Sequence, residues 1–441
     1  MDRLLSPFAA LHAGEGADAV LLMLSVYLLL TAYYILKVVR EPLILSAGGA
    51  ELKSYTAGAQ AVLLLFLIPA YGAVANRVNR IRLISIVTLF FISNLVVFYF
   101  LAFANTPGLG AAFFVWVGIF NLMIVAQFWS FANDVYTPEQ GRRLFGILGF
   151  GQTLGAASGG FISKLLIGRL HVYQLMLVAA ALLVGYLLLI LVVNRRAQRT
   201  AREAAIAAAP MIDRRGGFAL IMKDRYLLLI ALLLLLLNVV NTNGEYILGR
   251  VVSGKAAQLA AAGNTGGLAS DEFVKQFIGS FYADYITWVS VVTALIQIFL
   301  VSRILKRFGV RAALYVLPVV ALGAYSVLAF VPVLALIRAA KIGENSLDYS
   351  LNNTARQALF LPTSREAKYK AKAAIDTLFV RAGDLSSAGL VFLGTLIALQ
   401  PRDFAIMNMV LIVVWLLIVV GIGRRHRMLT EVQNADPRPA E

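Results

Sequence analysis

The chain has 441 residues, of which 60% are hydrophobic and 14% are charged, whereas soluble domains are about half apolar and about one quarter charged. This composition cannot supply the polar surface of a soluble protein of this size, so a water-soluble fold is excluded and the excess apolar side chains are expected to face lipid. The absence of cysteine and the presence of only three histidines exclude disulfides and cysteine-ligated metals and argue against a histidine-rich metal site. The formal net charge of +16 has two interpretations, nucleic acid binding or the topology of a membrane protein.

Twelve apolar runs are long enough to cross a bilayer, which takes about 20 residues for roughly 30 Å of hydrocarbon. The first run is longer than the apolar core of a signal peptide and leads directly into a second, so we interpret it as a membrane span and not as a cleaved leader. We therefore predict an all-α, polytopic membrane protein with twelve transmembrane helices. Their expected positions are residues 19–39, 55–75, 83–104, 113–135, 145–167, 172–193, 226–248, 281–304, 312–331, 334–360, 373–399 and 406–422.

Lysine and arginine are concentrated in every second loop between these runs. The positive-inside rule therefore places both termini in the cytoplasm, and most of the net charge is explained as a topology signal. Nucleic acid is accordingly not an expected partner. The basic loops contain Arg77, Arg80 and Arg82; Arg142 and Arg143; the segment 194–225; Arg303, Lys306, Arg307 and Arg311; Arg365, Lys368, Lys370 and Lys372; and Arg424, Arg425 and Arg427.

The chain divides into two halves of six predicted helices. Residues 194–225 are rich in arginine and alanine and contain Pro210, which indicates a cytoplasmic linker. Residues 72–80 resemble the Gly-x-x-x-Asp-Arg-x-Gly-Arg loop of the major facilitator superfamily, and residues 302–309 occupy the equivalent place in the second half. We expect two six-helix repeats, at 1–193 and 226–427, with a tail at 428–441 and a substrate site between the repeats near the bilayer midplane.

The tenth predicted span carries a stripe of polar side chains, mostly three or four residues apart, which places them on one helix face. Charged side chains in a membrane normally face a cavity or a partner, so this stripe is a candidate substrate site. The alternative is a set of internal pairs, Arg338 or Lys341 with Glu344 and Asp348 with Asn352. The stripe consists of Arg338, Lys341, Glu344, Asn345, Asp348, Asn352, Asn353 and Arg356.

The first predicted span ends with Tyr33, Lys37 and Arg40 on one face, before Glu41 and Pro42. Arginine and lysine bind phosphate oxygens, and a tyrosine ring can stack on a base, so these residues suit a phosphorylated or purine-like substrate. The alternative is that both cations extend to the outer membrane interface.

Other spans carry isolated polar residues for which hydrogen bonding between helices is an equally good explanation. A cluster of glycines at 146–160 in the fifth span is better explained by close helix packing than by a nucleotide loop, since no Gly-Lys-Ser/Thr follows it. We find no catalytic or Walker motif, so we expect a non-enzymatic carrier without a cofactor, driven by exchange or by a gradient. The isolated residues are Gln127, Asn133, Asp134, Asn238, Asn241, Glu245, Asp376, Arg381 and Asp384.

Three segments resemble the ATP:ADP antiporter family of bacterial and plastid nucleotide transporters. Residues 34–41 look like the family's Tyr-Thr-Ile-Leu-Arg-Asp-Thr-Lys-Asp, and residues 128–134 are similar to its Phe-Trp-x-Phe-Ala-Asn-Glu. The most specific match is Tyr-Ser-Leu at 349–351, Pro362, and Lys-Tyr-Lys-Ala-Lys-Ala-Ala-Ile-Asp at 368–376. The resemblance implies the major facilitator fold and nucleotide transport, with Arg40 and one of Lys370 or Lys372 at the positions of family lysines associated with transport.

The chain departs from this family at two acidic positions, which are occupied by Val117 and Asn241, while Glu245 lies one helical turn after the second. We predict a carrier of the bacterial inner membrane, acting as a monomer on a nucleotide or a related phosphorylated anion. A proton-coupled carrier of another organic anion and a non-transporting subunit that docks a partner or lipid remain the alternatives. The substrate site is predicted at Tyr33, Lys37, Arg40, Asn133, Asn241, Arg338, Lys341, Asn345, Asn352, Lys370 and Lys372, and gating or proton coupling at Glu245, Glu344, Asp348, Asp376 and Asp384.

Overall fold

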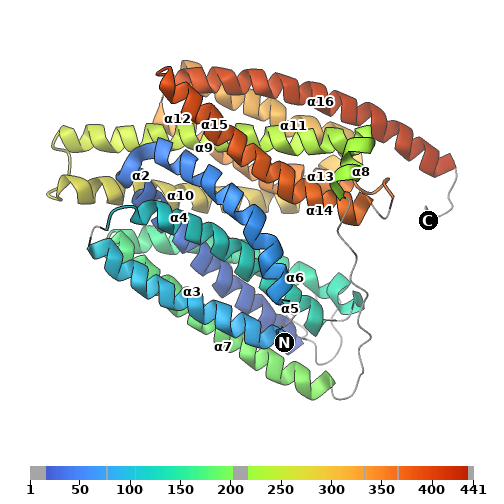
Figure 1. The fold of residues 1–441 in the computed structure, drawn as a ribbon, viewed down its shortest axis with the longest axis horizontal. Helices are drawn as coiled ribbons and strands as arrows, with labels where there is room; N and C mark the ends of the chain where they lie inside the picture. The colour runs from blue at the N-terminus through green and yellow to red at the C-terminus, as the bar shows by residue number, and fades with distance from the viewer. Residues whose placement is uncertain are drawn as a thin grey trace. The chain divides into compact units, whose positions relative to one another are not determined.

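The computed structural model describes residues 16–75, 78–104, 106–136, 138–201, 217–331, 333–364 and 367–435. Within these ranges the chain is helical and contains no β-strand (Figure 1). The all-α class predicted from composition is therefore confirmed. Arg77, Arg365, the centre of the predicted linker (202–216) and the end of the tail lie outside the described residues.

The chain forms two compact units, and neither is continuous in sequence. Unit 1 consists of Met1–Gly48, Leu67–Ala208 and Lys255–Ser290, and unit 2 consists of Gly49–Phe66, Ala209–Gly254 and Val291–Glu441. Each unit therefore contains one short segment from the other predicted half of the chain. The predicted division at residues 193 and 226 stays a prediction.

Unit 1 is built from long apolar helices whose contacts are made by aromatic rings and small residues. Helices α3 and α7 lie side by side along their length (Figure 1), and the ring of Phe91 packs edge-on against Trp116 and Phe120. The elements are the first part of α2 (Gly16–Ala75), α3 (Arg80–Phe103), α4 (Leu109–Phe120), the π-helical turn η1 (Asn121–Val125), α5 (Ala126–Val135), α6 (Pro138–Ile167), η2 (Val172–Gln174), α7 (Leu175–Ala201) and most of α10 (Ser270–Ile296).

The glycines of α6 let this helix approach α2 closely. A Cβ atom on Gly155 would lie 2.5 Å from the carbonyl oxygen of Tyr27, and one on Gly159 would lie 2.7 Å from that of Thr31. No larger side chain fits at these distances. The prediction that this glycine cluster serves helix packing is confirmed for Gly151, Gly155, Gly159 and Gly160, whereas Cβ atoms on Gly146 and Gly149 would meet nothing within 4 Å.

Helix α2 spans 60 residues, which at 1.5 Å per residue is about 90 Å and about three times the hydrocarbon thickness. It contains Pro42 and Pro69, and Gly49 has a φ of 68°, a left-handed conformation that glycine adopts readily. The boundary between the two units falls at this glycine. The long helix is thus interrupted where the chain passes from one unit to the other.

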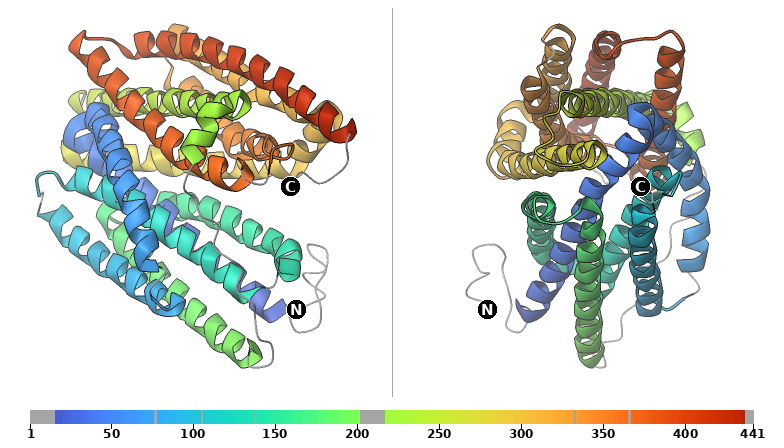
Figure 2. Two further views of the ribbon diagram at one scale, coloured as in Figure 1. Left: turned by 45° about the vertical axis from the view of Figure 1, so that its right-hand side comes forward. Right: turned by 90° about the vertical axis from the view of Figure 1, so that its left-hand side faces the viewer.

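Unit 2 is also helical, and α11 and α16 lie side by side in it (Figures 1 and 2). Its later helices contain several π-helical turns, which are rare and frequently occur at functional sites. The elements are α8 (Gly217–Lys223), α9 (Arg225–Ala261) up to residue 254, η3 (Gln297–Val301), α11 (Ser302–Phe330), α12 (Leu334–Leu347), η4 (Asp348–Asn352), α13 (Asn353–Ala358), η5 (Ala367–Ala371), α14 (Lys372–Ala374), η6 (Ile375–Phe379), α15 (Val380–Leu396) and α16 (Pro401–Ala435).

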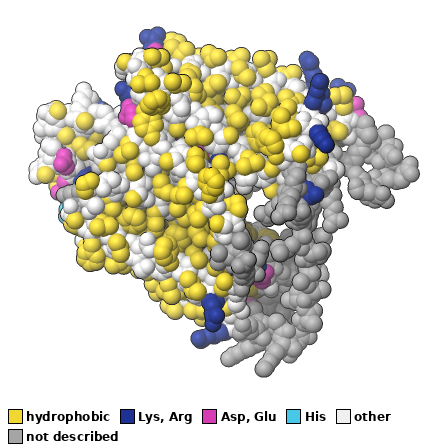
Figure 3. All heavy atoms as spheres, viewed as in Figure 1, with side chains coloured by type: hydrophobic (Ala, Val, Ile, Leu, Met, Phe, Trp, Pro, Cys, Tyr) yellow, Lys and Arg dark blue, Asp and Glu magenta, His cyan; other side chains and the backbone are white. Residues whose placement is uncertain are grey.

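Seven helical segments of the described chain are long and apolar enough to cross a membrane. Two of them, at Gly16–Tyr71 and Ser270–Phe330, have 56 and 61 residues, far more than one crossing needs. Large hydrophobic side chains cover much of the visible surface of the helices (Figure 3), and Phe66, for example, is 73% exposed. The chain is therefore a multi-pass membrane protein.

Candidate functional site

The polar stripe of the tenth predicted span lies inside unit 2. Lys341 and Glu344 of α12 are 0% and 4% exposed, and Lys341 Nζ lies 2.9 Å from Glu344 Oε2. The hydroxyl of Tyr325, on α11, lies 3.3 Å from Glu344 Oε1 and 3.0 Å from the carbonyl oxygen of Val240. Lys341 Nζ also donates to Asn241 Oδ1 at 3.4 Å. Lys341 is thus held between two helices by groups of unit 2 itself.

A glycine makes room for this arrangement. Gly244, one turn after Asn241 on α9, has no side chain, and a Cβ atom there would lie 2.1 Å from the Tyr325 hydroxyl and 2.7 Å from Lys341 Nζ. These distances are well inside van der Waals contact. The ammonium and the phenol can therefore approach α9 only because residue 244 is glycine.

A second ion pair adjoins the first. Asn345 Nδ2 donates to Glu245 Oε1 at 3.2 Å, and Lys53 Nζ lies 3.7 Å from Glu245 Oε2. Lys53 comes from α2 and is only 6% exposed. We call these residues together the charge cluster: Lys53, Asn241, Glu245, Tyr325, Lys341, Glu344 and Asn345.

Next to the charge cluster lies a group that sequence reasoning missed. Arg250 Nη1 is 3.1 Å from Glu51 Oε1 and donates to the Tyr246 hydroxyl at 2.7 Å, and that hydroxyl donates to Glu51 at 3.0 Å. Residues 49–66 are therefore tied to α9 by two ion pairs, that of Glu51 and that of Lys53. The available signal was that Glu51 and Lys53 are charged residues between two apolar runs, at 19–39 and 55–75.

The stripe continues into the π-helical turn η4. Asn352 Nδ2 donates to Asp348 Oδ1 at 2.8 Å, and Arg356 lies 3.9 Å from the same oxygen. The internal pairs that were the alternative explanation of the stripe, Lys341 with Glu344 and Asp348 with Asn352, are therefore present. Arg338, at the start of α12, is half-buried.

Asp384 is held by residues of two helices. Asn238 Nδ2 donates to Asp384 Oδ1 at 2.8 Å, Thr242 donates to the same oxygen at 3.2 Å, and Arg381 Nη1 donates to Asp384 Oδ2 at 3.1 Å. These bonds fasten α15 to α9. Three other predicted site residues lie on the preceding turns: Lys370 and Lys372 are half-buried and Asp376 is exposed.

The first-span residues lie in unit 1. Lys37 Nζ lies 5.1 Å from the ring centre of Tyr34 and 5.9 Å from that of Tyr33. The Arg40 guanidinium pairs with Glu41 at 2.5 Å and lies 4.4 Å from the ring centre of Phe114. Two cations thus lie against aromatic rings, the combination that the sequence predicts for a phosphorylated or aromatic substrate.

The remaining predicted site residue of unit 1, Asn133, is exposed near the end of α5. Its neighbour Asp134 pairs with Arg80 at 3.0 Å, and both of these side chains are largely exposed. Val117, at one of the two missing acidic positions, is fully buried.

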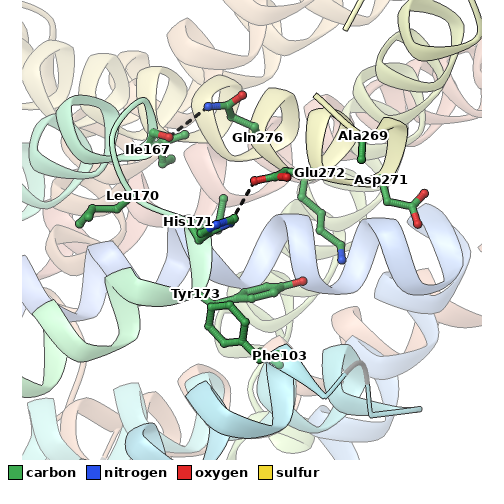
Figure 4. A pocket seen from close by; sticks show the side chains of 12 residues that line it. Phe103, Ile167, Leu170, His171, Tyr173, Ala269, Asp271, Glu272 and Gln276 are labelled. Atoms are coloured by element: carbon green, nitrogen blue, oxygen red, sulfur yellow. Dashed lines mark hydrogen bonds and ion pairs between the residues drawn. The ribbon is translucent and has the colours of Figure 1, made fainter. Parts of the chain in front are cut away.

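Unit 1 also contains a hollow of about 280 Å³ between the end of α6, η2 and the start of α10 (Figure 4). His171 Nδ1 lies 3.0 Å from Glu272 Oε1, and Gln276 donates to the carbonyl oxygen of Ile167 at 3.2 Å. Lys275 Nζ lies 5.5 Å from the ring centre of Tyr173. These contacts attach α10 to the turn before α7. The hollow is lined by both polar and apolar side chains.

The fold is similar to that of several solved membrane transporters. Similar solved structures are a POT family transporter in complex with a thioalcohol-conjugated peptide (TM-score 0.64, 14% identity, 91% of this chain and 95% of that chain), the nucleoside transporter NupG (0.60, 12%, 91% and 98%) and a bacterial homologue of the human lysosomal transporter Spinster (0.59, 14%, 95% and 99%). At 12–14% identity the similarity shows the fold alone.

The second half of the chain also matches the model of a known protein family. Residues 270–426 match the model of the TLC ATP/ADP transporter family, and this segment contains Lys341, Glu344 and Asn345. The resemblance predicted from the motifs at 349–376 is therefore confirmed over this segment. No curated protein matches the chain significantly.

Proposed function

We propose that this protein is an alternating-access transporter of nucleotides or closely related phosphorylated anions in a bacterial inner membrane. The observation that carries the proposal is the match of residues 270–426 to the ATP/ADP transporter family, a segment that contributes a buried lysine and a buried glutamate in contact. A charged pair in a membrane helix that faces the protein interior is typical of transport pathways.

We infer twelve membrane crossings in two six-helix repeats. The apolar segments Gly16–Tyr71 and Ser270–Phe330 are each long enough for two crossings of about 20 residues. Each also contains a glycine in the left-handed region, Gly49 and Gly309, with φ of 68° and 75°. These breaks support two crossings in each segment. The basic residues in alternate loops support cytoplasmic termini.

The cations of unit 1 and unit 2 would have different roles in this account. Lys37 and Arg40 lie on aromatic rings and are half-buried, so they are suited to attract a nucleotide, whose phosphate at Arg40 would compete with Glu41. Lys341 is buried against Glu344, so a substrate anion reaches it only if that pair separates. Glu245 and Asp384 hold helices together and are suited to gating.

A second candidate is a carrier of a different organic anion. It is favoured by Val117, a fully buried apolar residue at a position where the ATP:ADP antiporter family has an acidic residue. The likeness to nucleoside and peptide transporters is equally compatible with this candidate.

The test is uptake of radiolabelled ATP, ADP and AMP, each alone, into proteoliposomes that contain the purified protein, with and without unlabelled nucleotide inside. We expect saturable uptake of at least one nucleotide, and at least a tenfold loss for Arg40→Ala. Glu431→Gln, which changes an exposed carboxylate paired with Arg427, is the matched control. Absence of uptake for all three, together with uptake of a non-nucleotide organic anion, would support the second candidate instead.

A further inference from the structure

The charge cluster contains two ammonium groups and two carboxylates that balance one another. Lys341 pairs with Glu344 at 2.9 Å, and Lys53 lies 3.7 Å from Glu245. Three of these side chains are nearly or completely buried, and the side chain of Glu245 is 25% exposed. Asn345, the residue after Glu344 on α12, donates to Glu245 Oε1 at 3.2 Å. The two ion pairs therefore lie next to each other.

The balance of positive and negative charges restricts how a substrate anion can bind in the charge cluster. An ion in a medium of low dielectric constant is stable only when it is paired. If a substrate phosphate contacts Lys341 while Glu344 stays ionised, the site holds at least one unbalanced negative charge. Binding of an anion at Lys341 therefore requires that the negative charge of Glu344 be removed.

The surroundings of Glu344 are suited to its neutral form. The Tyr325 hydroxyl lies 3.3 Å from Glu344 Oε1 and, like any hydroxyl, can both donate and accept a hydrogen bond. Asn241 Oδ1 lies 3.4 Å from Lys341 Nζ, so the ammonium keeps a polar partner when the carboxylate no longer binds it. A protonated Glu344 and a released Lys341 would both remain hydrogen-bonded.

The other ionisable groups near Glu344 are already engaged in contacts of their own. Asp348, one turn later on the same helix, is bonded to Asn352 and lies 3.9 Å from Arg356. Arg250, on α9, is paired with Glu51. Arg338 lies on the same helix, two turns before Glu344. Glu344 lies ten residues after the start of α12 at Leu334, about 15 Å along the helix and about half the hydrocarbon thickness.

We propose that Glu344 couples anion transport to proton uptake, so that the protein is a proton–anion symporter. The proposal rests on the proposed transport function and adds its driving force. A proton from the solvent binds a carboxylate oxygen of Glu344, the Lys341–Glu344 pair separates, and Lys341 Nζ donates to an oxygen of the substrate anion. On the other side of the membrane the anion leaves, the proton returns to solvent, and the ion pair forms again. No covalent bond to the substrate is made or broken. Glu245, paired with Lys53, is the second carboxylate that can be neutralised in the same way.

The experiment measures uptake of labelled ADP into proteoliposomes together with internal acidification, followed with trapped pyranine. For the unmodified protein, an acidic exterior should raise initial uptake at least fivefold over equal pH on both sides, and ADP entry should acidify the interior. For Glu344→Gln, the ratio of gradient-driven uptake to counterflow uptake should fall to about one, and the acidification should disappear. Glu431→Gln is the matched control and should keep the ratio of the unmodified protein.

Three outcomes would overturn the proposal. First, the unmodified protein could take up ADP independently of the pH gradient and without internal acidification. This result would exclude proton coupling but would still support the proposed transport function. A gradient response that persists in Glu344→Gln shows that Glu344 does not bind the coupling proton, and its loss in Glu245→Gln alone would assign the proton to Glu245. No ADP, ATP or AMP uptake under any condition removes the proposed function and this proposal together. Because the pyranine measurement on the unmodified protein needs no variant, poor folding of Glu344→Gln does not prevent a decision.

Discussion

Lys341 Nζ lies 2.9 Å from Glu344 Oε2 in the interior of unit 2, and both side chains are buried. The pair is three residues apart on α12, a spacing that brings side chains together on one helix face. Both groups are almost completely excluded from solvent, so each is the main compensation for the charge of the other. This relationship explains both the stability and the proposed transport chemistry of the cluster.

Removal of one partner of this pair should destabilise the protein more than removal of both. Lys341→Met leaves an uncompensated carboxylate in the interior, and we expect a loss of about 3–5 kcal/mol in the free energy of unfolding. The double variant Lys341→Met, Glu344→Leu should recover most of that loss because no isolated charge remains. Denaturant unfolding in detergent micelles measures both, and equal destabilisation of the single and double variants would show that the pair is not buried as described.

Replacement of two glycines of α9 by alanine should have opposite effects on the stability of the protein. A Cβ atom on Gly244 would collide with Tyr325 and Lys341, whereas one on Gly254 meets nothing within 4 Å. Gly254→Ala should be neutral or stabilising by up to about 1 kcal/mol, because alanine favours the helix. Gly244→Ala should destabilise by about 1–3 kcal/mol, because the collision forces side chains out of place. Thermal unfolding monitored by intrinsic fluorescence distinguishes them, and similar melting temperatures for the two variants would contradict the packing of the cluster.

The ion pair at the hollow of unit 1 should contribute little to stability. His171 and Glu272 are both largely exposed, and exposed pairs contribute about 0–1 kcal/mol. We expect Glu272→Gln to change the free energy of unfolding by no more than about 1 kcal/mol at any pH between 6 and 8. A loss as large as that of Lys341→Met would mean that this contact is buried in the membrane protein.

Much of the arrangement was predictable from local sequence patterns. The apolar runs predict helices, and the spacing of Lys341, Glu344 and Asp348 predicts a polar face with internal pairs, since contacts three and four residues apart depend on helix geometry alone. The small residues of α6 likewise predict close packing.

The long-range partners could not be predicted. Lys53 and Glu245 are separated by 192 positions in the sequence, and Tyr325 reaches Glu344 from another helix. No periodicity within one helix records which neighbour will face it. The role of Gly244 was hidden for the same reason, because a single glycine in a helix becomes informative only when the side chains opposite it are known.

The central claim, transport by alternating access, is tested most directly by a reversible disulfide in unit 2. A Cβ atom on Gly58 would lie 2.7 Å from the Cβ of Ala388, and a disulfide needs about 3.8 Å, so a separation of about 1 Å suffices. Both residues lie in unit 2, but Gly58 belongs to the first predicted repeat and Ala388 to the second, so we expect this contact to open during alternating access. The chain has no cysteine, so Gly58→Cys with Ala388→Cys introduces the only thiols.

The decisive measurement is counterflow of labelled ADP by this double variant in proteoliposomes, oxidised and then reduced, beside each single variant. We predict that oxidation of the two cysteines abolishes counterflow in the double variant only and that a reductant restores it. Full counterflow in the oxidised, quantitatively cross-linked protein would contradict alternating access through this contact.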